Sequence, residues 1–399
     1  MRPMAAIGAK KRKRIGIIYE SFSLERKSGI NVYVKAIYNA LKEERDFSVK
    51  LLRVRSNSDL ISDEYCEEEL TSYMPDVIHN YSHFLLPTIL PAVHSFINNN
   101  RLDIVHTQGI QCPSSRDISL IKKDNSKFKF ILTQHGFPAR HDLATLLGET
   151  YLAVVGREIL RKADHVIVVN NFMKKLMMPY TGRGKISVIY NGVDTRLFRP
   201  LKNQDELRRK WKSKLGILED KYLLLFVGRL SPEKNIFTLL RMMQLLDRRF
   251  KLAIVGDGLM YGPLFTFAKV TKIDDRVVFL GELPHREIVE LYSMTTLGVS
   301  ATLYEGFSLS VAEALACGVP VVCPRVQGVL EIVDDGEDGI LIRDSRDYKS
   351  FAREVKRLAK NPELRREMGY NGRRKVERNF NFDNMINQTI NIYRRVLRA

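Results

Sequence analysis

Short apolar runs alternate with amphipathic stretches along most of the chain, and this alternation predicts a parallel β-sheet. The runs are rich in valine and isoleucine, and several are apolar throughout, which is typical of strands buried on both faces. In the first half the predicted strands are 14–19, 48–54, 103–107, 130–134, 165–170 and 186–190. The segments between them, such as 32–41 and 172–178, carry apolar residues at helical spacing. Repeated strand–helix alternation favours an α/β fold with helices on both faces of the sheet.

The same pattern starts again after a turn-rich join at residues 191–200, NGVDTRLFRP. The second set of predicted strands is 222–227, 250–255, 277–280, 297–300, 320–323 and 340–342. We therefore expect two Rossmann-like, doubly wound domains, 1–197 and 198–379, that face a central cleft. Ligands of such domains bind outside the carboxyl ends of the strands.

The last twenty residues, 380–399, predict a helix that crosses back to the first domain. Ile386, Ile390, Tyr393 and Leu397 recur there at helical spacing, and this gives the segment one apolar face.

Composition narrows the class of protein. The chain has 399 residues, 45% of them hydrophobic, which suits two hydrophobic cores rather than one. Its four cysteines form no CxxC pair, as expected in a reducing compartment. No apolar run approaches the length that spans a bilayer, and residues 1–14 lack the apolar core of a secretory signal. These features predict a cytoplasmic protein.

The formal net charge of +18 suggests an anionic partner, although solvated lysines and arginines explain the same balance. The cations are spread over many predicted helices without a finger, helix-turn-helix or RNP pattern, so nucleic acid is not expected. Basic residues 10–14 precede the first strand, and Lys35, Lys42, Arg45 and Lys50 lie in the same domain. They are compatible with a protein that is peripheral on the inner, anionic membrane face.

The strongest local pattern is LYEGFSLSVAEALACGVP, residues 303–320. Glu305 follows a predicted strand, Ser308 is placed to cap a helix, and Glu313 lies within that helix. The two carboxylates are expected to point into the same cleft from different heights. The start of the helix also offers backbone N–H groups to an anion. The competing interpretation is a loop and a helix with solvated glutamates.

A second pattern is VGRLSPEKN, residues 227–235. Gly228 allows a close turn at the end of a strand, and Arg229 and Lys234 follow it. An arginine fork and a compact lysine charge could clamp a diphosphate here. Two ordinary surface cations would look the same in the sequence.

Two weaker patterns lie in the first half. His135 follows an apolar strand in TQHGF, although His106 in DIVHTQG is equally visible and a lone histidine is more often structural. Ser28 and Gly29 form a small-residue entry to a helix, where backbone can approach a phosphate. All these candidates fall at the carboxyl ends of predicted strands. Independent structural roles would not predict this shared location.

From Arg14 onward the chain resembles the retaining glycosyltransferases of family four, which have the two-domain GT-B fold. The most specific likeness is the E-x7-E element from Glu305 to Glu313. It is supported by VGRLSPEKN, YNGVDTRLF and TQHGF, and by the fact that these motifs occur along the chain in the same order as in that family. The resemblance implies transfer of a sugar from a nucleoside-diphosphate donor to a hydroxyl of a glycan or lipid-linked acceptor. It also implies retention of the anomeric configuration.

The resemblance also implies roles for individual residues. Arg229 and Lys234 would bind the donor diphosphate and stabilise it as it leaves, Glu305 would lie near the donor sugar, and His135 beside the transferred sugar. Glu313 would hydrogen-bond the nucleotide ribose. The remaining donor-binding positions would contribute backbone: Gly29, Gly228, Gly306, Phe307, Ser308 and Leu309. Ser28 stands where the family has the first of two glycines.

No DxD triplet occurs in the sequence, so we expect hexosyl transfer without a catalytic metal and without a cofactor besides the donor. A nucleotide-dependent oxidoreductase is one alternative, because VGDGLMYG at 255–262 follows a strand. Its glycines, however, are one residue off the G-x-G-x-x-G spacing. An epimerase or phosphorylase with the GT-B fold, and a binding protein without activity, are the others.

Overall fold

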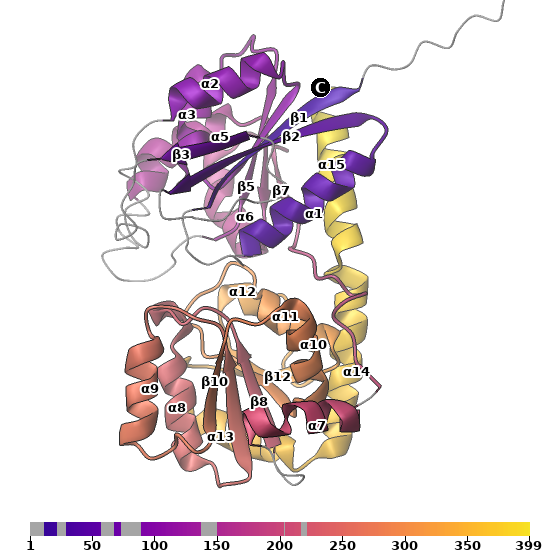
Figure 1. Cartoon of the computed structure of the whole chain (residues 1–399). Coiled ribbons are helices and arrows are strands. Elements are labelled where there is room, and N and C mark those ends of the chain that lie inside the picture. Colours follow the sequence, from indigo (N-terminus) through magenta and orange to yellow (C-terminus); the bar gives the residue numbers. More distant parts are fainter. Residues whose placement is uncertain are drawn as a thin grey trace, which may run out of the picture. The chain divides into compact units, whose positions relative to one another are not determined.

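A computed structural model describes residues 12–21, 29–56, 68–72, 89–136, 150–202, 204–216 and 222–399. The chain divides into two compact units (Figure 1). Unit 1 comprises Met1–Ile189 and Ile386–Ala399, and unit 2 comprises Tyr190–Met385. The units join between Ile189 and Tyr190, somewhat before the boundary that the sequence pattern placed after residue 197.

The described residues of unit 1 form a parallel sheet of seven strands in the order β3-β2-β1-β4-β5-β6-β7. The strands are β1 (Lys13–Ser21), β2 (Phe47–Ser56), β3 (Glu68–Ser72), β4 (Ile104–Gln108), β5 (Lys129–Gln134), β6 (His165–Val168) and β7 (Ile186–Val188). The six strands predicted for this half are all present. The edge strand β3, EELTS, has no apolar run and was missed.

Helices cover both faces of this sheet (Figure 1). On one side lie α2 (Leu90–Asn99), α3 (Pro113–Ile121) and α5 (Arg157–Lys162), and on the other lie α1 (Gly29–Glu43) and the end of α15 (Phe382–Val396). A π-helical turn, Leu152–Gly156, leads into α5, and α6 (Asn171–Met177) continues as a 3-10 turn, Met178–Tyr180.

The C-terminal helix α15 begins in unit 2 and ends in unit 1. In unit 1 the hydroxyl of Tyr393 lies 2.7 Å from Nδ1 of buried His106, and Arg394 pairs with Glu44 at 2.8 Å. These contacts attach the end of the helix to β4 and to the residue that follows α1.

The described residues of unit 2 form a second parallel sheet, of six strands, in the order β10-β9-β8-β11-β12-β13. Its strands are β8 (Tyr222–Val227), β9 (Phe250–Val255), β10 (Val277–Gly281), β11 (Leu297–Val299), β12 (Val321–Pro324) and β13 (Gly339–Ile342). Each corresponds to a predicted strand, because nearly continuous apolar runs are what a sheet covered on both faces requires.

Helices α8 (Ile236–Leu245), α9 (Tyr261–Val270) and α13 (Tyr348–Ala359) cover one face of this sheet (Figure 1). The other face carries α7 (Gln204–Leu215), α10 (His285–Met294), α11 (Leu309–Ala316) and α14 (Pro362–Asn379), and the short α12 spans Gln327–Leu330. Among the described residues, no helix is long and apolar enough to cross a membrane.

Candidate active site

The strand order of unit 2 reverses between β8 and β11. From β8 the sheet grows through β9 to β10 on one side, and from β11 through β12 to β13 on the other. The loops that leave β8 and β11 therefore diverge, and the crevice at their carboxyl ends is where open α/β sheets bind ligands. Arg229 and Lys234 follow β8 and Glu305 follows β11, so the strongest predicted residues gather at one edge of one sheet.

The glycines beside this edge allow two loops to pack backbone against backbone. Gly228 has φ +154° and Gly256 has φ +129°. A Cβ on Gly256 would lie 2.0 Å from the carbonyl oxygen of Gly228, and one on Gly258 would lie 2.6 Å from that of Leu230. Gly256 and Gly258, two of the glycines that suggested a dinucleotide motif, are thus required by contact between the loops after β8 and β9.

Lys234 and Glu305 form a salt bridge across the reversal point. Their side chains are only 18% and 20% exposed, whereas Arg229 is 45% exposed and lies 3.8 Å from Glu233. A half-buried pair is less screened by water than a surface pair. The structure therefore presents two cations, each beside a carboxylate, at the place where an anionic group would bind.

The backbone joins the loops that carry these charges. Glu233 accepts hydrogen bonds at its carbonyl oxygen from the Leu303 amide (2.8 Å) and from the Thr302 hydroxyl (3.2 Å). Asn235, in the left-handed region at φ 50°, donates its side-chain amide to the carbonyls of Ala301 (3.1 Å) and Ser345 (2.8 Å). Asparagine tolerates this conformation better than most residues. The relative position of Lys234 and Glu305 is therefore fixed before any ligand arrives.

The turn from Glu305 to Leu309 is held from behind by Gly328. A Cβ at that position would lie 2.3 Å from the carbonyl oxygen of Glu305, and the Ser308 amide donates to the Gly328 carbonyl at 3.2 Å. Gly306 forms the bend, and the ring of Phe307 packs against Phe380 with centroids 5.7 Å apart.

Ser308 occupies the N-cap position of α11, as predicted, but its side chain makes no capping hydrogen bond. The backbone amides at the start of α11 are therefore not capped by this hydroxyl.

Glu313 lies one helical turn beyond Leu309 in α11. Burial raises the pKa of its carboxyl to about 8. Burial is also the main cause of the raised pKa values of Tyr292 and Cys317, and the charge of Glu313 adds to both. Burial thus disfavours the ionised form of Glu313.

In unit 1, His135 follows β5 and lies against Tyr33 with ring centroids 4.9 Å apart. Its Nε2 lies 2.8 Å from Oε1 of Gln108, and burial lowers its pKa to about 3, so the imidazole is neutral near pH 7. Gly29 is the first residue of α1. Ser28, and the Phe137 that completes TQHGF, lie outside the described residues.

Sequence reasoning missed three residues that shape these loops. Glu233 could have been found as an opposite charge four residues after Arg229. Gly328 and Gln108 carry no such signal, because their roles depend on which backbone or ring lies against them in the fold.

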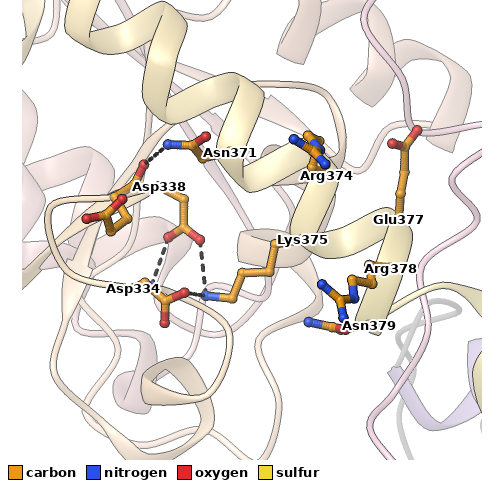
Figure 2. A pocket seen from close by; sticks show the side chains of 9 residues that line it. Asp334, Asp338, Asn371, Arg374, Lys375, Glu377, Arg378 and Asn379 are labelled. Carbon is orange, nitrogen blue, oxygen red and sulfur yellow. Dashed lines mark hydrogen bonds and ion pairs between the residues drawn. The ribbon is translucent and has the colours of Figure 1, made fainter.

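A surface hollow of about 550 Å³ lies elsewhere in unit 2 and contains none of the predicted site residues (Figure 2). Lys375 spans it, with its ammonium 2.6 Å from Asp334 and 3.1 Å from Asp338, and Asn371 donates to the Glu337 carbonyl at 3.1 Å. These bonds attach the turn before β13 to α14, which is a structural role.

Two family models match consecutive parts of the chain. The model described as Glycosyltransferase Family 4 matches residues 27–197, and Glycosyl transferases group 1 matches residues 208–375. Together they span most of the sequence and nearly all of both sheets. The chain belongs to the family 4 glycosyltransferases, with the GT-B fold.

Similar sequences include the N-acetyl-alpha-D-glucosaminyl L-malate synthase of Bacillus anthracis, which is 27% identical over 80% of this chain and 83% of that protein. An uncharacterized glycosyltransferase of Methanocaldococcus jannaschii is 30% identical over 57% of this chain, a match that spans 59% of that relative's length.

Solved structures of other proteins share this fold over nearly the whole length of the chain. A sucrose-phosphate synthase from Thermosynechococcus elongatus has a TM-score of 0.81 and 23% identity, with 97% of this chain and 100% of that one covered. HepE of Anabaena, solved in complex with UDP-glucose, has a TM-score of 0.74 and 17% identity, with 95% and 99% covered.

Proposed function

We propose that this glycosyltransferase moves a hexosyl group from a nucleoside-diphosphate sugar to a hydroxyl of a glycan or lipid-linked acceptor, with retention of the anomeric configuration. The observation that carries the proposal is the half-buried pair of Lys234 and Glu305 beside Arg229, at the strand reversal of unit 2. Solved structures of HepE with UDP and with UDP-glucose support a nucleotide-sugar donor.

The charges match what the reaction needs. Breaking the bond between the anomeric carbon and the diphosphate oxygen builds positive charge on the sugar and negative charge on the leaving group, as in glycoside hydrolysis. Arg229 and Lys234 would stabilise the departing diphosphate, and Glu305 would face the sugar. Cations held in place before the reaction contribute most, since they need not reorganise as charge develops.

The proton of the incoming hydroxyl would pass to an oxygen of the leaving phosphate. Glu313 would hydrogen-bond the ribose, and His135, which is neutral, would lie beside the transferred sugar. We propose no catalytic metal and no cofactor besides the donor, because Arg229 and Lys234 supply the positive charge that the diphosphate requires. Chelation with EDTA is then expected to leave the rate unchanged.

The test is incubation of the chain with uridine and guanosine diphosphate sugars, first alone and then with a cellular lipid extract. We expect slow release of nucleoside diphosphate without acceptor, and a glycosylated product by mass spectrometry with it. The anomeric configuration of the product follows from its NMR coupling constants. Sugar phosphate formed only from inorganic phosphate and a glycan would instead identify a phosphorylase.

A further inference from the structure

The sheet of unit 1 has its own reversal of strand order, between β1 and β4. From β1 the chain builds outward to β2 and β3 and then returns to place β4 on the other side of β1. The crevice outside the carboxyl ends of β1 and β4 is therefore a second place where a ligand is expected. Glu20 lies near the end of β1, and Gln108 is the last residue of β4.

Glu20 is a buried carboxylate at this point, with only 9% of its surface exposed. Its Oε1 accepts a hydrogen bond of 3.0 Å from the amide of Ser114, in the first turn of α3. Burial raises the pKa of Glu20, and the nearby hydroxyl and amide of Ser114 and thiol of Cys112 oppose that effect. The carboxyl and the hydroxyl therefore lie beside each other at the start of α3.

Several polar atoms here have no hydrogen-bond partner within the part of the chain that the structure describes. Oε2 of Glu20 and Oγ of fully buried Ser114 are two, and Nε2 of Gln108 and Nδ1 of His135 are two more. Exchanging the oxygen and nitrogen of the Gln108 amide would still leave one polar atom of Gln108 and one of His135 unpaired. Buried polar groups are nearly always paired in native proteins, so a group at a strand reversal with several unpaired atoms points to a ligand.

We propose that Glu20 and Ser114 bind a hydroxyl group of a neutral acceptor. A hydroxyl can donate to Oε2 of Glu20 and accept from the hydroxyl of Ser114. An anionic group would be rejected, because the carboxylate of Glu20 already takes the Ser114 amide at the start of α3, where an anion would otherwise bind. The assignment rests on the proposed function and names the chemical class of its acceptor.

The experiment begins with the full chain and donor alone. Absence of nucleoside diphosphate release with every donor would overturn the proposed function, and this assignment with it. With a donor that is hydrolysed, methyl α-glucopyranoside and glycerol are added as neutral probes and glucose 6-phosphate as the anionic probe. We expect the neutral probes to accelerate release and the phosphate not to. No acceleration by either neutral probe, or a stronger effect from glucose 6-phosphate, would overturn this inference alone.

Variants then locate the effect. Glu20→Gln keeps an oxygen for the Ser114 amide but replaces the second acceptor with a donor, and Ser114→Ala removes the hydroxyl. Each is expected to raise the probe concentration for half-maximal acceleration about tenfold or more. Asp117→Asn is the control, since Asp117 is a buried carboxylate of the same helix whose oxygens pair with Arg116 and the Ile89 amide.

Thermal unfolding identifies any variant that has lost its fold. If either Glu20→Gln or Ser114→Ala fails to fold, the other variant tests the assignment. If Glu20→Gln and Ser114→Ala match wild type, or if Asp117→Asn shifts the half-maximal concentration as much as they do, the assignment is wrong.

Discussion

Arg229 and Lys234 are the residues on which the proposed chemistry depends most directly. We expect Arg229→Ala and Lys234→Ala each to lower turnover by about 10²-fold, the usual effect of removing one preorganised charge partner. Lys210→Ala and Arg249→Ala are matched controls, because these cations form exposed ion pairs elsewhere in unit 2. Wild-type turnover at saturating donor in either site variant would contradict the proposed stabilisation of the diphosphate by Arg229 and Lys234.

The two glutamates of the E-x7-E element are expected to differ in kinetics. Glu313→Ala should mainly raise the donor KM, since a ribose contact stabilises the ground state and transition state alike. Glu305→Ala should also lower kcat, because Glu305 would face the reacting sugar and already pairs with Lys234. Steady-state kinetics with varied donor distinguish the two, and identical changes in KM and kcat would rule out separate roles.

Glu313 also makes the stability of the unliganded protein depend on pH. Burial raises its pKa in the folded chain from the ordinary 4.5 to about 8. Between these values the folded state binds a proton that the unfolded state does not, so the free energy of unfolding falls as pH rises. We expect Glu313→Gln to lose less thermal stability than wild type between pH 5 and 8. Glu367→Gln, at an exposed position of α14, should follow the wild-type curve; a Glu313→Gln curve parallel to wild type would count against the raised pKa.

At the scale of elements, each candidate group is placed by a loop that another loop supports. The β8 loop rests on glycines after β9, and the turn after β11 rests on Gly328. In unit 1, His106 connects β4 to Thr133 of β5 and to Tyr393 of α15, at 2.7 Å each. The chemistry thus depends on contacts between elements that are distant in the sequence.

Gly328→Ala tests this dependence. The new Cβ would lie 2.3 Å from the Glu305 carbonyl oxygen, so the turn must shift and move Glu305 away from Lys234. We expect kcat to fall about tenfold or more, since small misplacements of reacting groups slow catalysis strongly. Gly262→Ala is the control, because a Cβ there meets nothing within 4 Å. Equal activity of the two variants would show that the turn tolerates displacement.

At the scale of the molecule, some of the basic residues that suggested a membrane surface contact other groups of unit 1. Arg12 donates to the Glu44 carbonyl at 3.0 Å, and Lys13 lies 3.7 Å from Asp103. Lys42 and Arg45 are exposed, but acidic side chains lie among them in the sequence. Lys10 and Lys11 lie outside the described residues. Membrane binding through this surface therefore remains a prediction.

We expect the protein to pellet with anionic vesicles at low salt, and less at about 0.5 M salt, since each cation near an anionic surface contributes roughly 1 kcal/mol that salt screens. Neutral vesicles should not recruit it. The double variant Lys42→Glu with Arg45→Glu should weaken pelleting, whereas Lys349→Glu with Lys360→Glu, exposed in unit 2, should not. Equal pelleting with both kinds of vesicle, or with neither, would exclude an electrostatic membrane site.

The sequence by itself determined the doubly wound architecture, because a strand buried on both faces must be an apolar run and the helices between must be amphipathic. It also predicted the charged loops after β8 and β11, since turn residues and charges cluster there. The edge strand β3 was missed because it is mostly polar and lacks that pattern.

Only the tertiary structure decided what those residues contact. The pairing of Lys234 with Glu305, the support of that turn by Gly328, and the meeting of Glu20 with Ser114 each join segments far apart in the chain. No local periodicity encodes such contacts, because they depend on the order in which strands assemble into a sheet. That order brings β1 beside β4 and β8 beside β11, and the two reversals place polar groups where the loops diverge.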